Sequence, residues 1–431
     1  MKKYIGIRRE DKNDWERRVA LIPADIKEIR GKYNIQAILQ PSPLRIYTDE
    51  EYSDAGAIIN EDVNEANTII SVKEMPLNFF KQDKTYIFFS HVIKGQSYNM
   101  DMLHRMMELK VNLIDYECIV DETGRRLIFF GRYAGLAGMI ETFYAYGQKL
   151  KVGGISSPFE KFKQAYAYET LEHAKAEIAQ IGEYIAEHGL PAELVPVVVG
   201  FAGYGNVSLG AQEIFDLLPF KEISPQELID NYGSLDSKQH IYKVVFKEAD
   251  MVQPKTGEFE LQDYYSHPEK YDGIFEQYLP HLTLLVNCIY WTDKYPRLVT
   301  KEYLKSQAGT DMKLKVIGDI SCDIEGSIEI TQKVTYPDEA CFTYSPKNDD
   351  FKDGTPADGI SVMAVDNLPC EFSRESSAEF SQVLKGFVND IVEADFTVAF
   401  NELALPFPIK KALILHRGQL TPEYEYIREF L

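Results

Sequence analysis

Two ionisable residues near the start of the chain each follow an apolar segment. Lys73 follows the segment 68–72, and His91 follows the segment 86–90. Such segments are typical of buried parallel strands, and open α/β sheets bind their ligands at the carboxyl ends of the strands. A histidine titrates near neutrality without perturbation, and burial or neighbouring cations can lower the pKa of a lysine toward the same range. Lys73 and His91 therefore form a candidate general acid/base pair, whereas each alone could be a solvated strand end or a capping histidine.

Further charged residues stand at similar positions and could complete a cleft around this pair. Glu74 and Lys94 lie beside it in the sequence, and Arg18, Glu117 and Arg126 follow other predicted elements. Together they would give the cleft cationic anchors and additional titratable groups. For the two glutamates, ordinary surface salt bridges are the alternative interpretation.

A glycine-rich turn predicts a dinucleotide site. Residues 195–202 have the composition of a buried strand, and residues 211–218 have that of an amphipathic helix. Between them, Gly203 and Gly205 permit the positive φ and the close backbone approach that a pyrophosphate requires at a helix N-terminus. The third position of the G-x-G-x-x-G pattern is Ser208, which is still small, and Gly210 can supply close packing of helix on strand. The predicted cofactor ligands here are Gly203, Gly205, Asn206, Val207 and Ser208, with a tight structural turn as the alternative.

The bulk composition bounds the class of protein. The length of 431 residues suits two domains, and contents of 45% hydrophobic and 12% aromatic residues indicate a fully folded chain. A formal net charge of -21 argues against nucleic acid or an anionic membrane as a partner. The 5 cysteines lack C-x-x-C spacing, so we expect reduced thiols and no metal site. The N-terminus becomes charged before an apolar segment forms, and no apolar run approaches ~20 residues, so we expect a cytoplasmic protein.

Alternating strand and helix patterns predict an α/β fold with two Rossmann-like domains, parallel sheets and a cleft between the domains. Residues 1–135, completed by 366–431, would form the substrate domain, and residues 136–365 would form the dinucleotide-binding Rossmann domain. Residues 234–278 are rich in aromatic and charged side chains without a recognisable motif, so they are expected to form a lid or to pack. The patterns predict strands at 4–8, 36–40, 68–72, 86–89, 112–116, 195–202, 221–223, 244–246, 282–288 and 315–319, and helices at 24–33, 101–110, 133–140, 159–187 and 376–399.

Several ordered segments carry a resemblance that covers nearly the whole chain. They are residues 8–18 (RREDKNDWERR), 88–96 (FFSHVIKGQ), 114–117 (IDYE), 131–138 (GRYAGLAG), 205–212 (GNVSLGAQ), 318–323 (GDISCD), 366–369 (DNLP) and 373–376 (SRES). These segments resemble the lysine/2-oxoglutarate reductase half of bifunctional aminoadipic semialdehyde synthase. More distant relatives are the fungal lysine-forming saccharopine dehydrogenases and the alanine dehydrogenase and transhydrogenase group.

The resemblance implies an oxidoreductase that condenses L-lysine with 2-oxoglutarate reversibly to saccharopine. The lysine amine adds to the keto carbon, water leaves to give an imine, and hydride from a nicotinamide coenzyme reduces that imine. By carry-over, Lys73 and His91 are the acid/base pair. The other implied roles are carboxylate binding by Arg18 and Arg126, a point charge from Lys94, a neutral donor at Gln96, and tuning of the pair or binding of the amino-acid end by Glu74 and Glu117.

The resemblance also implies partners. The bifunctional family continues into a second dinucleotide-binding half after the segment that matches residues 412–427, so we expect a separate glutamate-forming saccharopine dehydrogenase. The expected ligands are the small molecules L-lysine, 2-oxoglutarate and saccharopine. A homo-oligomer is also possible.

NADP(H) is the expected coenzyme, with NAD(H) as the alternative. In NAD enzymes a carboxylate at the end of the second strand binds the ribose diol. Ser224 stands at that point after the predicted strand 221–223, so repulsion of a 2′-phosphate is absent, and the resembling reductase half is NADP-linked. Asp319 and Asp323 are expected on the nicotinamide side with Asn287 nearby, although Asp323 equally suits a helix cap.

Two other functions stay open at this point. One is an amino-acid or imine dehydrogenase of the same superfamily with another amine donor, since a sequence does not show the volume of a pocket. The other is a non-catalytic, nucleotide-sensing protein. The presence of both Lys73 and His91 argues against the second, because a sensor needs neither.

Overall fold

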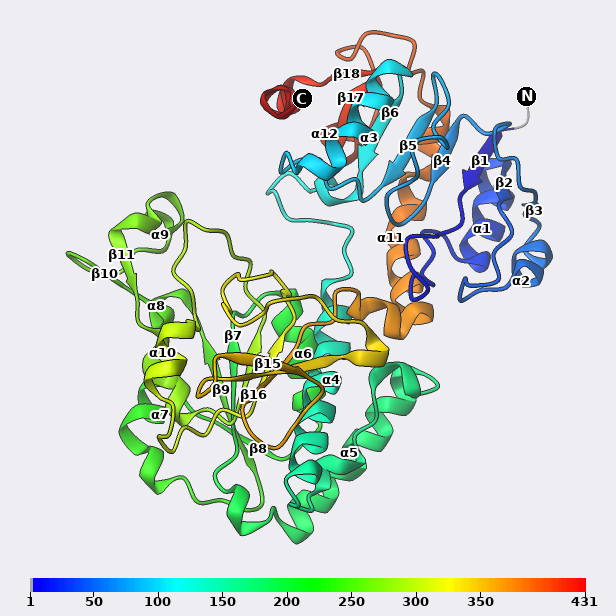
Figure 1. Ribbon diagram of the computed structural model, residues 1–431. Helices are drawn as coiled ribbons and strands as arrows, with labels where there is room; N and C mark the ends of the chain where they lie inside the picture. The colour runs from blue at the N-terminus through cyan, green and yellow to red at the C-terminus, as the bar shows by residue number, and fades with distance from the viewer. Residues whose placement is uncertain (1–2) are drawn as a thin grey trace. The chain divides into compact units, whose positions relative to one another are not determined.

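The computed structural model describes residues 3–431 and divides the chain into two compact units (Figure 1). One unit takes the residues up to Phe130 together with Ser373–Leu431, and the other takes Gly131–Phe372. Compared with the expected boundaries after residues 135 and 365, both shift to the points where the long helices α4 (Gly131–Val152) and α11 (Ser373–Glu393) begin. Met1 and Lys2, which open the expected substrate domain, lie outside the described residues.

The first unit contains an eight-stranded sheet that is parallel except at one edge. Its spatial order is β18-β17-β6-β5-β4-β1-β2-β3, in which β17 runs antiparallel to β6 and β18 antiparallel to β17. This hairpin was not predicted; its two-residue turn, Arg417 and Gly418, has positive φ at both positions. The strands are β1 (Lys3–Ile7), β2 (Ile35–Leu39), β3 (Ile58–Ile59), β4 (Thr68–Ile70), β5 (Thr85–Phe88), β6 (Asn112–Asp115), β17 (Leu413–His416) and β18 (Gln419–Leu420).

Helix α11 belongs to this first unit although it follows the second unit in sequence. Its Ser381 Oγ and Lys385 Nζ lie 2.6 and 2.8 Å from the carboxylate of Asp25 on α1 (Pro23–Tyr33). Its buried Phe380 and Leu384 belong to the same apolar core as the strands. The unit is completed by α2 (Asp49–Asp54), α3 (Ser97–Glu108) and α12 (Phe407–Lys411).

The second unit contains another eight-stranded sheet, with the order β15-β14-β16-β13-β12-β7-β9-β8. Six neighbouring strands, from β16 to β8, are parallel, and β14 and β15 form an antiparallel hairpin at the other edge that was not predicted. The strands are β7 (Val198–Ala202), β8 (Phe220–Glu222), β9 (Ile241–Phe246), β12 (Leu284–Asn287), β13 (Val316–Asp319), β14 (Cys341–Ser345), β15 (Asp350–Asp353) and β16 (Ile360–Met363), and a separate ribbon contains β10 (Val252–Pro254) and β11 (Tyr271–Gly273).

Helix α5 (Leu171–His188) corrects one prediction. A helix was expected over 159–187, but residues 158–161 and 165–167 form short 3-10 turns, and the helix begins only after Thr170. The Thr170 hydroxyl accepts the backbone N–H of His173 and so caps the first turn. The other helices of this unit are α4, α6 (Asn206–Phe215), α7 (Pro225–Asn231), α8 (Glu248–Met251), α9 (Leu261–Ser266) and α10 (Lys301–Ser306).

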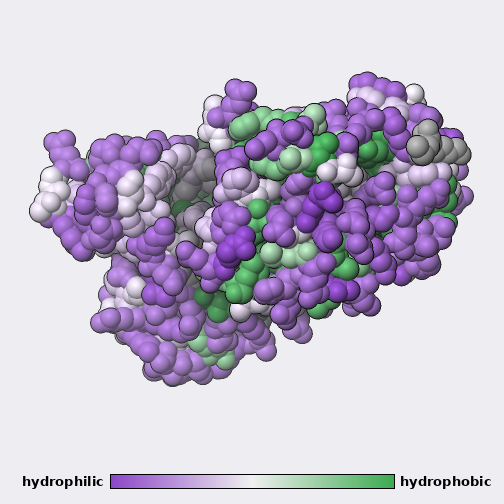
Figure 2. Space-filling model, turned by 90° about the horizontal axis from the view of Figure 1, so that it is seen from above, coloured by the Kyte–Doolittle hydropathy of each residue, from purple (hydrophilic) through white to green (hydrophobic). Residues whose placement is uncertain are grey.

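Membrane and metal features are simple within the described chain. No helix of residues 3–431 is long and apolar enough to cross a membrane, and in that range no group of three or more His, Cys, Asp or Glu side chains is placed to hold a metal ion. The five cysteines are free thiols. Hydrophilic residues dominate the face seen in Figure 2, with apolar residues in smaller areas between them. The cytoplasmic location and the homo-oligomer stay predictions.

Candidate active site

A hydrogen-bonded chain of three side chains lies at the carboxyl edge of the first sheet. His91 Nδ1 is 2.6 Å from Glu74 Oε1, and Lys12 Nζ is 2.8 Å from Glu74 Oε2. Glu74 follows β4 and His91 follows β5, and these strands are parallel neighbours. Burial raises the pKa of the Glu74 carboxyl, but the bonds and charges of His91 and Lys12 outweigh it and lower that pKa to about 2. Glu74 is therefore an ionised carboxylate at neutral pH.

The backbone and an aromatic ring hold the imidazole of His91 in place. His91 has a φ of 52°, an uncommon value for a residue other than glycine and one found at functional sites. Its ring stacks on Phe89 with the centroids 6.2 Å apart, and its carbonyl accepts a hydrogen bond from Asn99 Nδ2. Since Nδ1–H donates to Glu74, Nε2 is the atom left to exchange a proton, and 33% of the side chain is exposed.

Lys73 follows β4, and a carboxylate holds its backbone. Glu10 accepts hydrogen bonds from the backbone N–H groups of Val72 and Lys73 at 2.7 and 3.0 Å. Desolvation and the nearby Glu16 raise the pKa of Glu10 to about 7. Glu10 was not predicted as a site residue, although it lies in the segment 8–18 that carried the resemblance. It places a group that titrates near neutrality beside Lys73.

Arg18 is buried and already bonded, which was not expected of a substrate anchor. Its Nε and Nη2 lie 2.9 and 2.6 Å from the two carboxylate oxygens of Glu16, and the side chains are 4% and 0% exposed. The guanidinium also lies over the ring of Phe130 at 4.2 Å. Contact of Arg18 with a substrate carboxylate stays a prediction, and it requires Glu16 to give up part of this pairing.

Arg126 is better placed than Arg18 to meet a ligand. Its guanidinium lies over the ring of Phe89 at 5.3 Å and 3.9 Å from the carboxylate of Glu117. The Arg126 side chain is 37% exposed. Because Phe89 also stacks on His91, the structure brings Arg126 to the same aromatic ring as the imidazole, and Glu117 pairs with Arg126.

The two remaining predicted substrate ligands lie on the turn before α3. Lys94 is exposed, and Gln96 is half-buried and directly precedes the helix. Gln96 Oε1 accepts a hydrogen bond from the Tyr98 hydroxyl at 2.6 Å.

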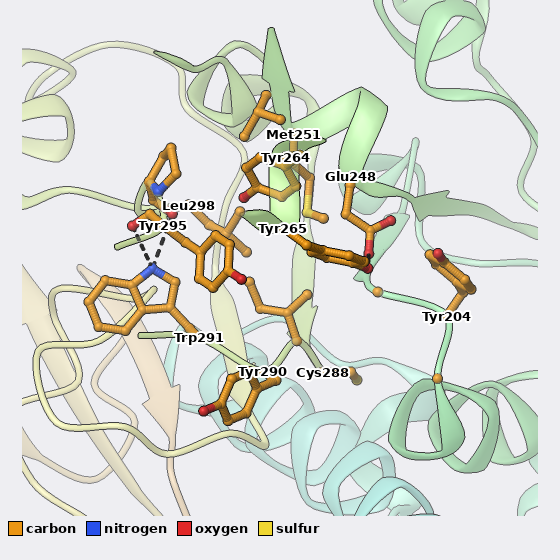
Figure 3. A pocket seen from close by; sticks show the side chains of 15 residues that line it. Tyr204, Glu248, Met251, Tyr264, Tyr265, Cys288, Tyr290, Trp291, Tyr295 and Leu298 are labelled. Atoms are coloured by element: carbon orange, nitrogen blue, oxygen red, sulfur yellow. Dashed lines mark hydrogen bonds between the residues drawn. The ribbon is translucent and has the colours of Figure 1, made fainter. Parts of the chain in front are cut away.

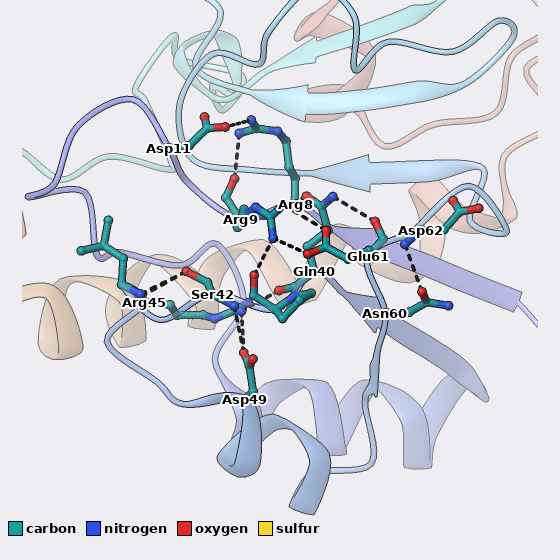
Figure 4. A network of polar contacts seen from close by, with 12 residues as sticks. Arg8, Arg9, Asp11, Gln40, Ser42, Arg45, Asp49, Asn60, Glu61 and Asp62 are labelled. Atoms are coloured by element: carbon teal, nitrogen blue, oxygen red, sulfur yellow. Dashed lines mark hydrogen bonds and ion pairs between the residues drawn. The ribbon is translucent and has the colours of Figure 1, made fainter.

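Ion pairs hold the loop of residues 8–18, which contains Glu10, Lys12 and Arg18. Figure 4 shows the contacts of Arg8 and Arg9 in this loop. Arg9 donates two hydrogen bonds to the carboxylate of Glu61, at 2.8 and 2.9 Å, and Arg8 pairs with Asp11 inside the loop.

The glycine turn of the second unit fits close approach of a ligand to the backbone. Gly203 has a φ of 93°, and its N–H donates to the carbonyl of Phe246 at 3.0 Å. Gly205 differs from the expectation, because its φ is -78° and lies in the extended region. A Cβ at Gly205 would have no atom within 4 Å, so the missing side chain leaves open space at the start of α6. Asn206 is exposed there and Val207 is half-buried.

Two small residues after this turn, Ser208 and Gly210, pack α6 against different neighbours. Ser208 is fully buried and forms a hydrogen bond with the thiol of Cys288, which follows β12. A Cβ at Gly210 would lie 2.1 Å from the carbonyl oxygen of Arg132 on α4. Ser208 therefore makes the helix-to-strand contact, and the expectation that Gly210 makes it is wrong, because Gly210 packs helix on helix.

The order of the strands differs from the order on which the predicted ribose site depends. The strand beside β7 is β9, and β8 lies at the edge. Ser224 follows the edge strand and caps α7 by accepting the N–H of Glu227, so it does not stand beside the glycine turn. The residue after β9 that faces the turn is Glu248, which the sequence analysis missed because it took 221–223 as the neighbouring strand.

A cavity of about 540 Å³ lies beside the glycine turn (Figure 3). This volume lies within the ~300–1,000 Å³ of small-molecule sites. Gly203 and Gly205 form part of the wall, and the rest consists of Glu248, aromatic side chains and other apolar side chains. The segment 234–278, which contains no recognisable motif, therefore supplies part of the pocket wall. The aromatic residues of the wall are Tyr204, Tyr264, Tyr265, Tyr290, Trp291 and Tyr295.

The residues expected on the nicotinamide side separate into a buried pair and an exposed carboxylate. Asn287 and Asp319 end the neighbouring strands β12 and β13, and Asn287 Nδ2 donates to Asp319 Oδ1 at 2.8 Å. Burial raises the pKa of Asp319 to about 6. Asn287 Oδ1 is buried without a hydrogen-bond partner among residues 3–431. Asp323 is exposed in the loop that follows β13.

These two units have the fold of the alanine dehydrogenase and transhydrogenase class. A solved L-alanine dehydrogenase covers 99% of this chain and 100% of its own at a TM-score of 0.64 and 16% identity. The transhydrogenase of Sinorhizobium meliloti covers 97% of this chain and 99% of its own at a TM-score of 0.52 and 15% identity. Residues 6–137 match the family model of the alanine dehydrogenase/PNT N-terminal domain.

Sequence comparison leads to particular relatives. The chain is 38% identical over 442 residues to alpha-aminoadipic semialdehyde synthase of Arabidopsis thaliana, a match that covers 98% of this chain and 41% of the relative. It is 33% identical over 443 residues to the mitochondrial synthase of Mus musculus, covering 99% of this chain and 48% of the relative. It is 27% identical over 392 residues to the NAD(+)-dependent, L-lysine-forming saccharopine dehydrogenase of Neurospora crassa, covering 88% and 89%.

The chain is thus a homologue of the aminoadipic semialdehyde synthases and of the lysine-forming saccharopine dehydrogenases, which confirms the resemblance predicted from the sequence. It spans less than half the length of the synthases that it matches.

Proposed function

We propose that the protein is a nicotinamide-dependent oxidoreductase that condenses L-lysine with 2-oxoglutarate reversibly to saccharopine. The observation that carries this proposal is the bonded chain of Lys12, Glu74 and His91 at the carboxyl edge of the first sheet. The names of the homologues, a semialdehyde synthase and a lysine-forming dehydrogenase, support the same class of substrate.

Joining an amine to a keto group and expelling water needs proton transfer in both directions. The ionised Glu74 orients the imidazole of His91 so that Nε2 accepts a proton from the attacking amine and returns one to the departing hydroxyl. Lys73, on the neighbouring strand end, is the second acid/base group. Arg126, half-exposed above Phe89, binds a substrate carboxylate.

The second unit holds the nicotinamide dinucleotide, which supplies or accepts the hydride when it is bound. The open space at Gly205 and the neighbouring cavity fit such a ligand. The preference for NADP(H) predicted from Ser224 loses its basis, because Ser224 follows the edge strand β8.

A turnover assay with a matched pair of variants tests this function. We expect consumption of the reduced coenzyme only when L-lysine and 2-oxoglutarate are both present. His91→Gln should lower kcat by roughly 10²–10⁴, while calorimetry finds an unchanged Kd for the coenzyme. His104→Gln, on the exposed face of α3, is the control and should behave like the wild type. Wild-type turnover by the His91→Gln variant would make His91 a structural histidine.

The same assay separates the other candidate functions. Turnover with a different amine in place of L-lysine would support a related amino-acid or imine dehydrogenase. A wild-type protein that binds the coenzyme but turns over no pair of amine and keto acid would support a nucleotide sensor.

A further inference from the structure

Strand order puts a carboxylate at the place where a Rossmann fold meets the adenosine ribose. In such folds, the end of the strand beside the first strand faces the ribose of the dinucleotide. Here β9 is the parallel neighbour of β7, and the carbonyl of Phe246 at its end accepts the N–H of Gly203. Glu248 comes after Lys247 in the segment that follows β9, and it lines the cavity with Gly203 and Gly205.

Two phenols hold this carboxylate. The Tyr265 hydroxyl donates to Glu248 Oε1 at 2.6 Å, and Figure 3 shows the two groups side by side. Tyr204 also forms a hydrogen bond with Glu248. Burial, with the added charge of Glu248, raises the pKa of both phenols, so they stay protonated as donors. Two donors do not use all the lone pairs of a carboxylate, so Glu248 keeps an acceptor site for a hydroxyl group.

The cavity wall contains no positive charge to balance a phosphate. Glu248 is the only Asp or Glu residue of the wall, and no Lys, Arg or His residue of the described chain is part of it. Lys247, the cation next in sequence, is exposed outside the wall. A phosphate close to Glu248 would meet like charge without a partner, whereas a hydroxyl would find an acceptor.

The remainder of the wall suits a flat base. Tyr264, Tyr290, Trp291 and Tyr295 present aromatic faces, and stacking of bases on aromatic rings is a common mode of recognition. Tyr290 is 72% exposed, so its ring is accessible from solvent.

We propose that Glu248 is the specificity-determining residue for the coenzyme: it binds the free 2′-hydroxyl of the adenosine ribose and so selects NAD(H) over NADP(H). The aromatic wall takes the adenine, and Tyr265 is a positioning residue for the carboxylate. This inference rests on the proposed use of a nicotinamide dinucleotide.

Calorimetric titration of the full chain with NADH and with NADPH, without substrate, tests the proposal. We expect the wild type to bind NADH at least tenfold more tightly, which is about 1.4 kcal/mol. The isosteric Glu248→Gln should bring the Kd values for NADH and NADPH closer together, and Glu248→Arg should make NADPH the tighter ligand. Tyr265→Phe should narrow the ratio less than Glu248→Gln does. Asp272→Asn removes the same charge from β11 outside the cavity and should leave the ratio unchanged.

The outcomes separate this inference from the proposed function. A wild type that binds NADPH as tightly as NADH, or a Glu248→Gln variant with the wild-type ratio, would overturn the role of Glu248 even if the enzyme condenses lysine. Selective binding of NADH without lysine-dependent turnover would support Glu248 and reject the proposed reaction. Failure of both nucleotides to bind would reject both. Thermal melting of each variant shows that the comparison concerns folded protein.

Discussion

Arg18 and Glu16 form a buried ion pair with two hydrogen bonds, and the guanidinium lies over the ring of Phe130. Removing one partner of such a pair leaves an uncompensated buried charge, whereas replacing both with apolar groups is often nearly neutral. We expect Arg18→Met to lower the free energy of unfolding by about 3–5 kcal/mol and the double variant Arg18→Met/Glu16→Leu to recover most of it. Urea denaturation measures both. A single variant as stable as the wild type would show that the ion pair does not stabilise the folded protein.

Residues that follow predicted strands could be found from the sequence, whereas residues in irregular loops could not. Lys73 and His91 were identifiable because each follows an apolar strand, and parallel neighbours bring such positions to one edge. Glu10 and Glu16 lie in a loop without a repeating pattern, so their contacts with β4 and Arg18 depend on tertiary structure. The pairing of Glu74 with His91 was open in the sequence, since a carboxylate could equally bind a ligand.

Two glycines near α6 differ in what an added side chain would contact, so substitutions at the two positions are expected to have different effects. A Cβ at Gly205 enters open space, whereas one at Gly135 on α4 would lie 1.9 Å from the carbonyl oxygen of Val207. We expect Gly205→Val to keep the wild-type melting temperature and to lose nucleotide binding by calorimetry. Gly135→Val should lower the free energy of unfolding by at least about 1–3 kcal/mol, because it overpacks two helices. Unchanged nucleotide affinity of Gly205→Val would remove the turn from the coenzyme site.

The positions of the helices and strands along the chain could largely be predicted from the sequence. The spatial order of the strands in each sheet could not. Strands β4, β5 and β9 overlap the predicted ranges because buried strands are apolar runs. Strand β8 is exposed at every position, and its pattern does not say whether it lies beside β7 or at the edge. Because of that ambiguity, the sequence pattern predicts Ser224 rather than Glu248 at the ribose position. Both antiparallel edge hairpins were missed because pairing partners are set by the whole sheet.

The pH dependence of global stability follows from buried carboxyls. Burial raises the pKa of Glu141 to about 7 and raises that of Glu371 as well, and the two share a hydrogen bond beside the backbone of Ala165 and Tyr166. Since these folded-state values lie above those of the unfolded chain, the stabilisation is complete at acid pH and is lost as the pH rises through 7. Glu371→Gln should therefore lose less melting temperature between pH 6 and pH 8 than the wild type.

Two comparisons make this prediction specific. Glu169→Gln alters an exposed carboxylate near the same segment and should follow the wild-type curve. The melting temperature of Glu371→Gln should still fall somewhat as the pH rises, because Glu10 also has a pKa of about 7. Parallel melting curves for the wild type and Glu371→Gln would show that the carboxyl pair is ionised in the folded protein.

The sheet of the first unit cannot be finished until the second unit has been synthesised. Strand β6 pairs with β17, and α11 packs in the same core, so ~300 residues separate β6 from its partner strand. At a translation rate of roughly 5–20 residues per second, β6 waits on the order of 15–60 s for its partner. During that time an unpaired strand edge and its apolar surface are exposed to solvent. The nascent chain is therefore expected to need a holding chaperone before it is complete, whereas the second unit can fold without interruption as it leaves the ribosome.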